Sequence, residues 1–173
     1  MLVILDLDMT LIDTGALKVY RDARRWREIK YHLRETRLYP GIREMVKAFH
    51  ENNIRMAVVT NSPSMYAREL LNYYSLPVDE VIGYHDTQRH KPAPEPFLLA
   101  MSLLNSDKEH TIAIGDSVND ILAAKNAGIV SCTALWDCSE MDALRNVDAE
   151  YDFTSPEQFK DFIIKNYTNT TVG

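Results

Sequence analysis

Short runs of apolar residues recur along the chain, and segments with apolar residues at every third or fourth position separate them. Residues 2–7, with the sequence LVILDL, are typical of these runs, because most successive positions are apolar and β-branched residues are included. Strands buried on both faces have this pattern, whereas a strand with one face in water alternates apolar and polar residues. We predict five such strands, at 2–7, 54–60, 78–84, 111–115 and 129–135.

Helical spacing of apolar residues predicts helices between these strands. In one such segment, Ile42, Met45 and Phe49 recur at intervals that place them on one face. Another segment ends at Gly128, and glycine commonly ends a helix because it adopts a left-handed backbone at low cost. The predicted helices are 15–37, 42–52, 63–73, 95–105, 118–127 and 156–166, and the tail at 169–173 is expected to fray.

The alternation of strands and helices predicts an α/β fold. We expect a Rossmann-like, doubly wound parallel sheet of about five strands, with flanking helices and right-handed crossovers. The chain has 173 residues, which is an ordinary length for one domain. Residues 1–173 are therefore predicted to form a single domain.

The composition is that of a globular protein, with 46% hydrophobic and 25% charged residues. A formal net charge of −6 argues against a nucleic acid as partner. No stretch approaches the roughly 20 apolar residues of a membrane span, and the first residues lack the basic start of a signal peptide. We therefore expect a cytoplasmic protein with no membrane partner. Cys132 and Cys138 lie outside any metal or redox motif and are expected to be ordinary small side chains.

Polar residues follow the predicted strands at the edge where parallel sheets bind their ligands. Four carboxylates, one lysine and several hydroxyl groups come from four separate segments and are expected to meet there. They are Asp6, Asp8 and Thr10 after the first strand, Thr60, Asn61 and Ser62 after the second, Lys91 in the loop after the third, and Asp116 and Asp120 after the fourth.

Carboxylates that lie this close together cannot all stay ionised without positive charge beside them. Lys91 supplies one positive charge, and a hard divalent cation with oxygen ligands, Mg²⁺ first, would supply the rest. A phosphate group would complete the site, because the cation and Lys91 would neutralise its oxygens. Thr60 and N–H groups of the loops would donate hydrogen bonds to it.

Four motifs in this order resemble the signature motifs of the haloacid dehalogenase superfamily. They read DLDMT at 6–10, VVTNS at 58–62, KPAPEPF at 91–97 and GDSVND at 115–120. The resemblance extends from Asp6 to about Phe153 and points to the phosphatase branch with a minimal cap. An aspartate at position 8 argues against the dehalogenase branch, which lacks one there.

The resemblance implies a role for each catalytic residue. Asp6 would be the nucleophile that forms an aspartyl-phosphate, and Asp8 would be the general acid that protonates the leaving group and then activates water as a base. Thr60 and the backbone of Asn61 would hold the phosphoryl group. Lys91 would neutralise the nucleophile and the phosphate.

The resemblance also implies a ligand set for Mg²⁺. Asp116 would bind the ion together with Asp6 and the backbone carbonyl of Asp8. Asp120 would be either a further metal ligand or a partner of Lys91. A magnesium-dependent phosphatase acting on a phosphomonoester is the expected function.

The gaps between the motifs bear on the substrate. Residues 11–40 span 30 positions, room for one long helix or a bent pair as a minimal cap, and an open site would admit a phosphorylated small molecule or macromolecule. Residues 18–37 carry eight Lys and Arg against three acids, which suits either a solvated helix face or a surface that attracts anions. Met9 stands where the family commonly has glycine, a departure that we expect to be tolerated.

Two other functions are open at this point. A phosphotransferase or mutase of the same superfamily would keep the aspartyl-phosphate away from water, which requires a cap that closes. A phospho-accepting binding module without turnover also combines an aspartate, a lysine and Mg²⁺ on a parallel sheet. An acid two residues after Asp6 favours turnover over simple acceptance.

Overall fold

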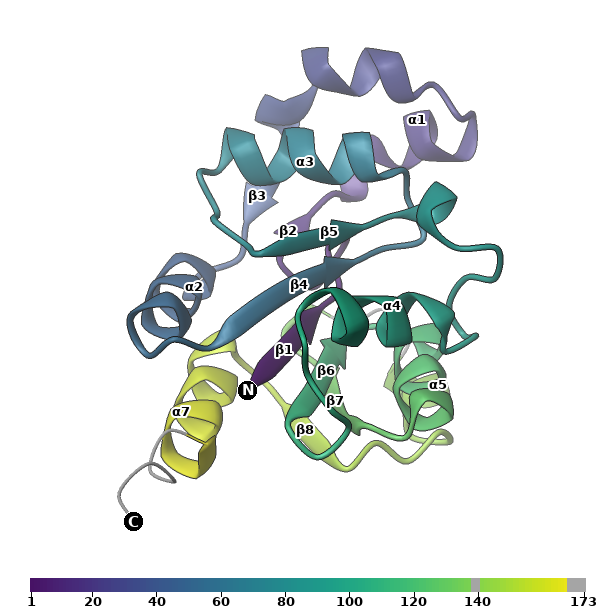
Figure 1. Ribbon diagram of the computed structural model, residues 1–173. Helices are drawn as coiled ribbons and strands as arrows, with labels where there is room; N and C mark the ends of the chain where they lie inside the picture. The colour runs from purple at the N-terminus through teal and green to yellow at the C-terminus, as the bar shows by residue number, and fades with distance from the viewer. Residues whose placement is uncertain (138–140, 168–173) are drawn as a thin grey trace.

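Six parallel strands form the central sheet of the protein (Figure 1). The structure is a computed structural model that describes residues 1–137 and 141–167. It confirms the α/β fold and adds one edge strand to the predicted five. In spatial order the strands are β5 (Glu80–Ile82), β4 (Arg55–Val59), β1 (Leu2–Leu5), β6 (Thr111–Gly115), β7 (Val130–Ala134) and β8 (Tyr151–Phe153).

Helices cover both faces of the sheet, which explains why the strands are apolar at successive positions. Val3 and Leu5 of β1 pack in one core cluster with α2 (Ile42–Glu51), α3 (Ser64–Tyr73) and α7 (Pro156–Tyr167). Leu2 and Ile4 point to the opposite face and pack with α4 (Glu95–Leu103) and α5 (Val118–Ala127). Figure 1 shows α2 and α7 on one side of the sheet and α4 and α5 on the other. Complete burial of one such aliphatic side chain stabilises the fold by roughly 1.5–3 kcal/mol.

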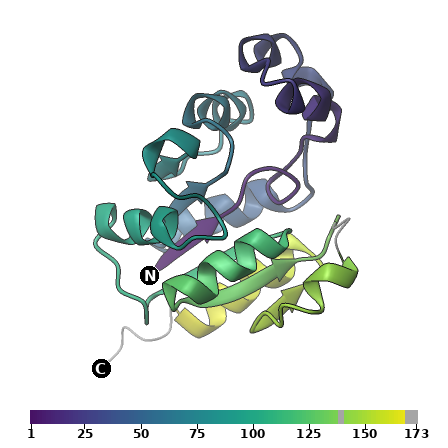
Figure 2. The same cartoon turned by 90° about the vertical axis from the view of Figure 1, so that its right-hand side faces the viewer.

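Residues 11–40 form a separate segment beyond the carboxyl end of β1 (Figure 2). Two short antiparallel strands, β2 (Ile12–Asp13) and β3 (Arg37–Leu38), close its base. Between them lie the five-residue helix α1 (Lys18–Asp22) and three short 3₁₀ segments, at Gly15–Leu17, Trp26–Tyr31 and Leu33–Glu35. The prediction of a helix across 15–37 is therefore wrong, and the two-stranded base was not predicted.

A helix-ending turn at Arg24 explains this difference. The N–H of Arg24 donates to the carbonyl of Arg21, and the N–H of Arg25 donates to the carbonyl of Tyr20. Arg24 itself has φ of 54°, the left-handed conformation that usually falls to glycine or asparagine in this turn. Because an arginine occupies the position, the sequence shows no helix stop there.

The remaining differences are small. The third strand is shorter than predicted, and α3 begins at Ser64 because Pro63 has extended backbone. A 3₁₀ turn (Tyr84–Asp86) follows β5, and a four-residue helix, α6 (Met141–Leu144), precedes β8. Helix α5 ends at Gly128 as predicted, with the glycine at φ of 72°. Cys132 is buried, whereas Cys138 and the tail at 169–173 lie outside the described residues.

Candidate active site

The strand order brings the predicted site residues together. Because β1 lies between β4 and β6, Asp6, Thr60 and Asp116 follow three neighbouring strands at their carboxyl ends. They line a cleft of about 500 Å³. Asp8, Asn61, Lys91 and Asp120 line the same cleft, as does Ser62, whereas Thr10 is not among the lining residues.

Lys91 is the buried cation of the cleft. Its side chain is only 4% exposed, and its ammonium donates to Asp6 Oδ1 at 2.6 Å and to Asp120 Oδ1 at 2.5 Å. A third hydrogen bond runs to the carbonyl of Val59 at 2.9 Å. Burial lowers the pKa of Lys91, but the two carboxylates outweigh burial, so its pKa is raised and the group stays charged.

Asn61 fixes the loop that carries Lys91. Its side-chain nitrogen donates to the Lys91 carbonyl at 3.0 Å, and its side-chain oxygen accepts the Lys91 N–H at 3.1 Å. The resemblance assigned Asn61 a role through its backbone only, and this two-point contact is an additional one. Thr60 Oγ1 accepts the N–H of Ser62 at 3.0 Å, which leaves the Thr60 hydroxyl hydrogen available for a substrate oxygen.

Asp120 is held by the start of α5. Its Oδ2 atom accepts the N–H and the hydroxyl of Ser117, at 3.1 and 2.6 Å, in a capping box. Oδ1 then remains for Lys91. Gly115 makes this approach possible, because a Cβ atom on residue 115 would lie 2.4 Å from the Asp120 side chain.

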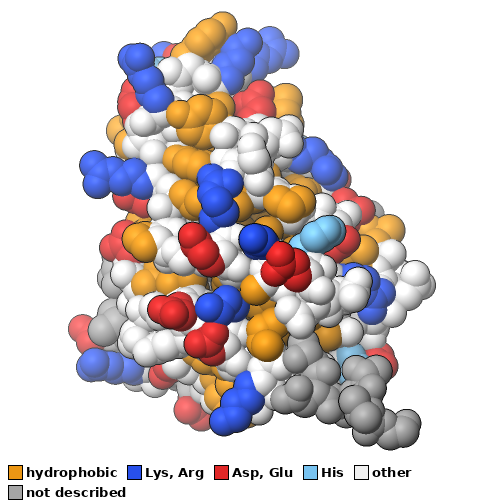
Figure 3. Space-filling model, turned by 90° about the vertical axis from the view of Figure 1, so that its left-hand side faces the viewer, with side chains coloured by type: hydrophobic (Ala, Val, Ile, Leu, Met, Phe, Trp, Pro, Cys, Tyr) orange, Lys and Arg blue, Asp and Glu red, His pale blue; other side chains and the backbone are white. Residues whose placement is uncertain are grey.

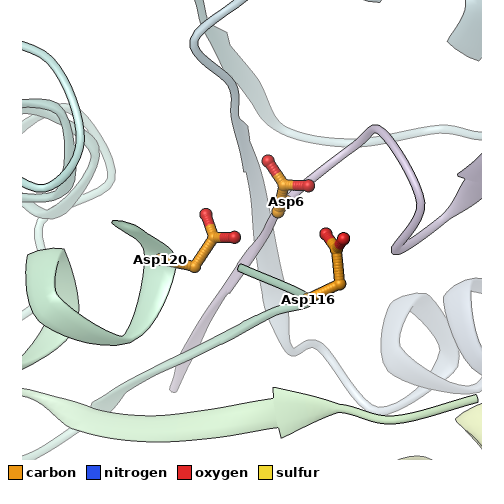
Figure 4. A group of neighbouring side chains, drawn as sticks. All are labelled: Asp6, Asp116 and Asp120. Atoms are coloured by element: carbon orange, nitrogen blue, oxygen red, sulfur yellow. The ribbon is translucent and has the colours of Figure 1, made fainter. Parts of the chain in front are cut away.

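Three carboxylates converge in the cleft (Figure 4). Asp6, Asp116 and Asp120 each offer one oxygen, and these oxygens lie within 4.8 Å of one another. Burial raises the pKa of Asp6 well above its usual value, although Lys91 opposes the shift. Burial and then the charge of Asp120 raise the pKa of Asp116 to about 6, and the Thr10 hydroxyl donates to Asp116 at 2.9 Å. Lys91 supplies one positive charge to these three carboxylates, so a net negative charge accumulates at this point of the cleft when all are ionised.

The carboxylate of Asp8 lies outside this cluster. Tyr66 donates to Asp8 Oδ1 at 2.5 Å and Thr14 donates to the same atom at 2.6 Å. Ser62 donates to Oδ2 at 3.1 Å, and the guanidinium of Arg21 forms an ion pair with the carboxylate. The proposed general acid thus contacts Tyr66 of α3, the adjacent Ser62 and the 11–40 segment rather than the other aspartates.

Sequence reasoning missed the side chains around Asp8. Tyr66 lies on the apolar face of α3 and is 1% exposed, so its pattern is that of a core residue. Arg21 is one of eight basic residues in a polar segment, and nothing in the spacing distinguishes it from the others. For Thr14 the sequence did offer a signal, because this hydroxyl residue lies only four positions after the first motif.

Met9 lies on the wall of the cleft. Its φ is 64°, in the left-handed region. This is the conformation that glycine adopts without cost, whereas other residues incur roughly 1 kcal/mol. The departure from the family's usual glycine is therefore tolerated at some cost in backbone energy.

The sequence matches the profile of a known family, described as haloacid dehalogenase-like hydrolase, over residues 16–134. The match includes the second, third and fourth motifs and more than half of the chain. The chain belongs to the haloacid dehalogenase-like hydrolase family. This membership confirms the family resemblance inferred from the motifs.

Curated relatives are identical to this chain at about a third of the matched positions. A pyrophosphatase PpaX from Halalkalibacterium halodurans is 33% identical over 127 residues, covering 72% of this chain and 59% of the relative. A phosphoglycolate phosphatase from Salmonella typhi is 38% identical over 125 residues, covering 68% of this chain and 48% of the relative. The chain thus spans about half to three-fifths of the length of these relatives.

Solved structures share the fold of this chain. A HAD-superfamily hydrolase from Ehrlichia chaffeensis superposes with a TM-score of 0.71 at 24% identity, over 94% of this chain and 95% of that one. A HAD-superfamily hydrolase from Geobacter sulfurreducens superposes with a TM-score of 0.74 at 18% identity, over 93% and 98%. Among the described residues, no helix is both long and apolar enough to cross a membrane.

Proposed function

We propose that this protein is a magnesium-dependent phosphatase that hydrolyses a phosphomonoester of a small molecule through an aspartyl-phosphate. The observation that carries the proposal is the buried Lys91 ammonium, which bridges Asp6 and Asp120 beside a third carboxylate. The names of the curated relatives, a pyrophosphatase and phosphoglycolate phosphatases, support a phosphate substrate.

The donor set fits a hard divalent cation. Three carboxylates and one lysine leave a charge of about −2 when all are ionised, which one divalent ion would neutralise. Carboxylate oxygens are the ligands that Mg²⁺ prefers. Asp6 and Asp116 would hold the ion together with the backbone carbonyl of Asp8, and Asp120 would either bind it or act through Lys91. A bound Mg²⁺ would draw negative charge from the phosphoryl oxygens in the transition state.

The side chains of the cleft would divide the reaction into two steps. An oxygen of Asp6 attacks the phosphorus atom, the bond from phosphorus to the leaving oxygen breaks, and Asp8 donates a proton to that oxygen. Water then attacks the phosphorus of the aspartyl-phosphate, Asp8 takes a proton from it, and Asp6 leaves with its carboxylate restored. Lys91 and Thr60, with the backbone of Asn61, would hold the phosphoryl oxygens in both steps.

Residues 11–40 would serve as the short helical cap of this site. The segment contributes Gly15, Lys18 and Arg21 to the cleft wall, and Arg21 contacts the carboxylate of Asp8. A cap of this size covers only part of the cleft. Water can then reach the aspartyl-phosphate, which favours hydrolysis over transfer to a second substrate.

Hydrolysis of an aryl phosphate tests the proposed function. We expect the purified protein to release inorganic phosphate from 4-nitrophenyl phosphate in the presence of Mg²⁺. A chelator should abolish the release, and excess Mg²⁺ should restore it, because the cation offsets the charge of the carboxylate cluster. Full activity after complete metal removal would contradict the assignment. A phosphoryl group that stays on the protein, with no further release of phosphate, would favour a phospho-accepting module.

Replacing Asp8 by asparagine is expected to slow turnover by about 10²–10⁴-fold, because general acid–base help is lost. The activated aryl ester needs little proton donation to its leaving group, so the variant should accumulate phosphoenzyme, detectable by intact-protein mass spectrometry. Asp13→Asn is the matched control, since Asp13 lies in the same segment and outside the cleft wall. Equal rates for the two variants would remove Asp8 from the mechanism.

Replacing Asp116 by asparagine is expected to change thermal stability in opposite directions without and with Mg²⁺. In chelator the variant should melt at or above the wild type, because one of three clustered charges is gone. In Mg²⁺ it should melt lower, because binding at 100 times the Kd stabilises the wild type by about 2.7 kcal/mol. Four melting curves measure this, with Asp161→Asn on α7 as the exposed control. If Asp116→Asn gains as much from Mg²⁺ as the control does, Asp116 is not a ligand.

A further inference from the structure

A second pocket adjoins the candidate active site. Its volume is about 270 Å³, and Trp26, Pro63 and Tyr84 are among its lining residues. Arg21 and Asn61 line this pocket and the active-site cleft alike. The two hollows therefore share a wall.

Three ring side chains contribute apolar surface to the second pocket. The Trp26 ring packs edge-on against buried Tyr66 at 5.5 Å between centroids, and the Tyr84 ring stacks on His90 at 3.7 Å. Pro63 precedes α3 and adds a rigid ring between them. Three ring surfaces around one hollow favour an apolar ring as its occupant, because aromatic faces bury large area at little entropic cost.

Two arginines bring positive charge to the pocket. Arg21 and Arg24 line it, and no carboxylate is among the lining residues within the described chain. Lys and Arg side chains also gather on the surface at the upper end of the molecule, where residues 11–40 lie (Figure 3). An occupant with a negative charge would be favoured over a neutral one.

Arg24 is the most available of these charges. Arg21 is paired with Asp8, whereas the Arg24 side chain has no hydrogen bond or ion pair with any residue in 1–137 or 141–167. The left-handed backbone of Arg24 ends α1 and lets the chain turn there, next to the pocket that Arg24 lines. This unpaired guanidinium can bind an anionic group without first losing an internal partner.

We propose that the second pocket binds the leaving group of the phosphate ester, and that the preferred leaving group is an apolar ring carrying a further negative charge. The inference rests on the proposed phosphatase function. In that mechanism Asp8 protonates the leaving oxygen, so the leaving group begins beside Asp8. Asp8 contacts Arg21, which lines both hollows. The leaving group therefore extends from the cleft past Arg21 toward Trp26 and Tyr84.

Three substrates with primary alkoxide leaving groups separate the contributions of ring and charge. They are ethyl phosphate, benzyl phosphate and 4-carboxybenzyl phosphate, each assayed with Mg²⁺ at 0.15 M salt. We expect kcat/KM to rise about tenfold or more from the ethyl to the benzyl ester, since a ring enters the pocket. A further rise of about threefold to fivefold is expected for the carboxybenzyl ester, the range for an exposed ion pair.

Variants assign these preferences to the pocket. Arg24→Gln should abolish the preference for carboxybenzyl over benzyl phosphate, and Trp26→Leu should lower the preference for benzyl over ethyl phosphate about tenfold. Tyr84→Ala tests the ring preference separately, because Tyr84 is 43% exposed and is not itself part of the 11–40 segment. Arg27→Gln is the matched control, since Arg27 lies in the same basic segment and outside this pocket.

The outcomes distinguish the two proposals. Hydrolysis of all three esters at equal kcat/KM would overturn the leaving-group pocket and leave the phosphatase intact. An equal loss in Arg24→Gln and Arg27→Gln on all three esters would also overturn it, because general attraction of anions would then explain the result. Hydrolysis of none of the esters, nor of an aryl phosphate, would be a failure of the proposed function itself.

Discussion

Replacing Asp6 by asparagine is expected to abolish phosphate release, with a fall in kcat of about 10⁴-fold or more. An amide cannot take the phosphoryl group to form an aspartyl-phosphate. Its carbonyl oxygen can still accept the Lys91 hydrogen bond that Asp6 Oδ1 now accepts at 2.6 Å, so the fold should persist. Steady-state hydrolysis of 4-nitrophenyl phosphate with Mg²⁺ measures the loss, and thermal unfolding checks that the variant is folded.

A second measurement separates the nucleophile from a residue that only binds. The Asp6→Asn variant should also fail to acquire phosphate in a rapid quench experiment, whereas Asp8→Asn should acquire it. Asp161→Asn, on the exposed side of α7, is expected to match the wild type in both assays. Wild-type turnover in folded Asp6→Asn would assign the nucleophile elsewhere and contradict the proposed mechanism.

Replacing Lys91 by methionine is expected to lower the free energy of unfolding by about 3–5 kcal/mol in chelator. Methionine has similar length but no charge, so Asp6 and Asp120 would face each other without the buried cation that now bridges them. Mg²⁺ should recover part of the loss, because it would supply positive charge to the same carboxylates. Urea unfolding with and without Mg²⁺ measures both effects.

The matched control for this prediction is Lys47→Met on α2. Lys47 forms only an exposed pair with Glu51 at 3.7 Å, so its loss should change the free energy of unfolding by at most about 0.5 kcal/mol. Activity of Lys91→Met should fall as well, since Lys91 also contacts the proposed nucleophile. An equal change in stability for the two variants would mean that the buried ammonium contributes no net stabilisation.

The sequence predicted the sheet and the edge at which the candidate site residues meet. Strands buried on both faces must be apolar at successive positions, and this pattern is visible without knowledge of the fold. The edge strand β8 was missed because the exposed residues Tyr151 and Asp152 break that pattern. The motif residues were found for a related reason, since the carboxyl ends of parallel strands share one edge. Asp6, Thr60 and Asp116 needed no tertiary information to be grouped.

The sequence by itself thus determined five of the six strands of the central sheet, the helices that flank them and the residues at their carboxyl ends, because local periodicity and chain order fix these features. Only the tertiary structure decided what surrounds them. Tyr66 has the pattern of a core residue, and its hydroxyl reaches Asp8 only because α3 packs beside the cleft. Arg24 follows the end of a helix in a left-handed conformation, which an arginine in the sequence does not predict. The second pocket arises where Trp26 and Tyr84 meet across 58 positions of sequence, and such long-range packing leaves no periodic signal in the chain.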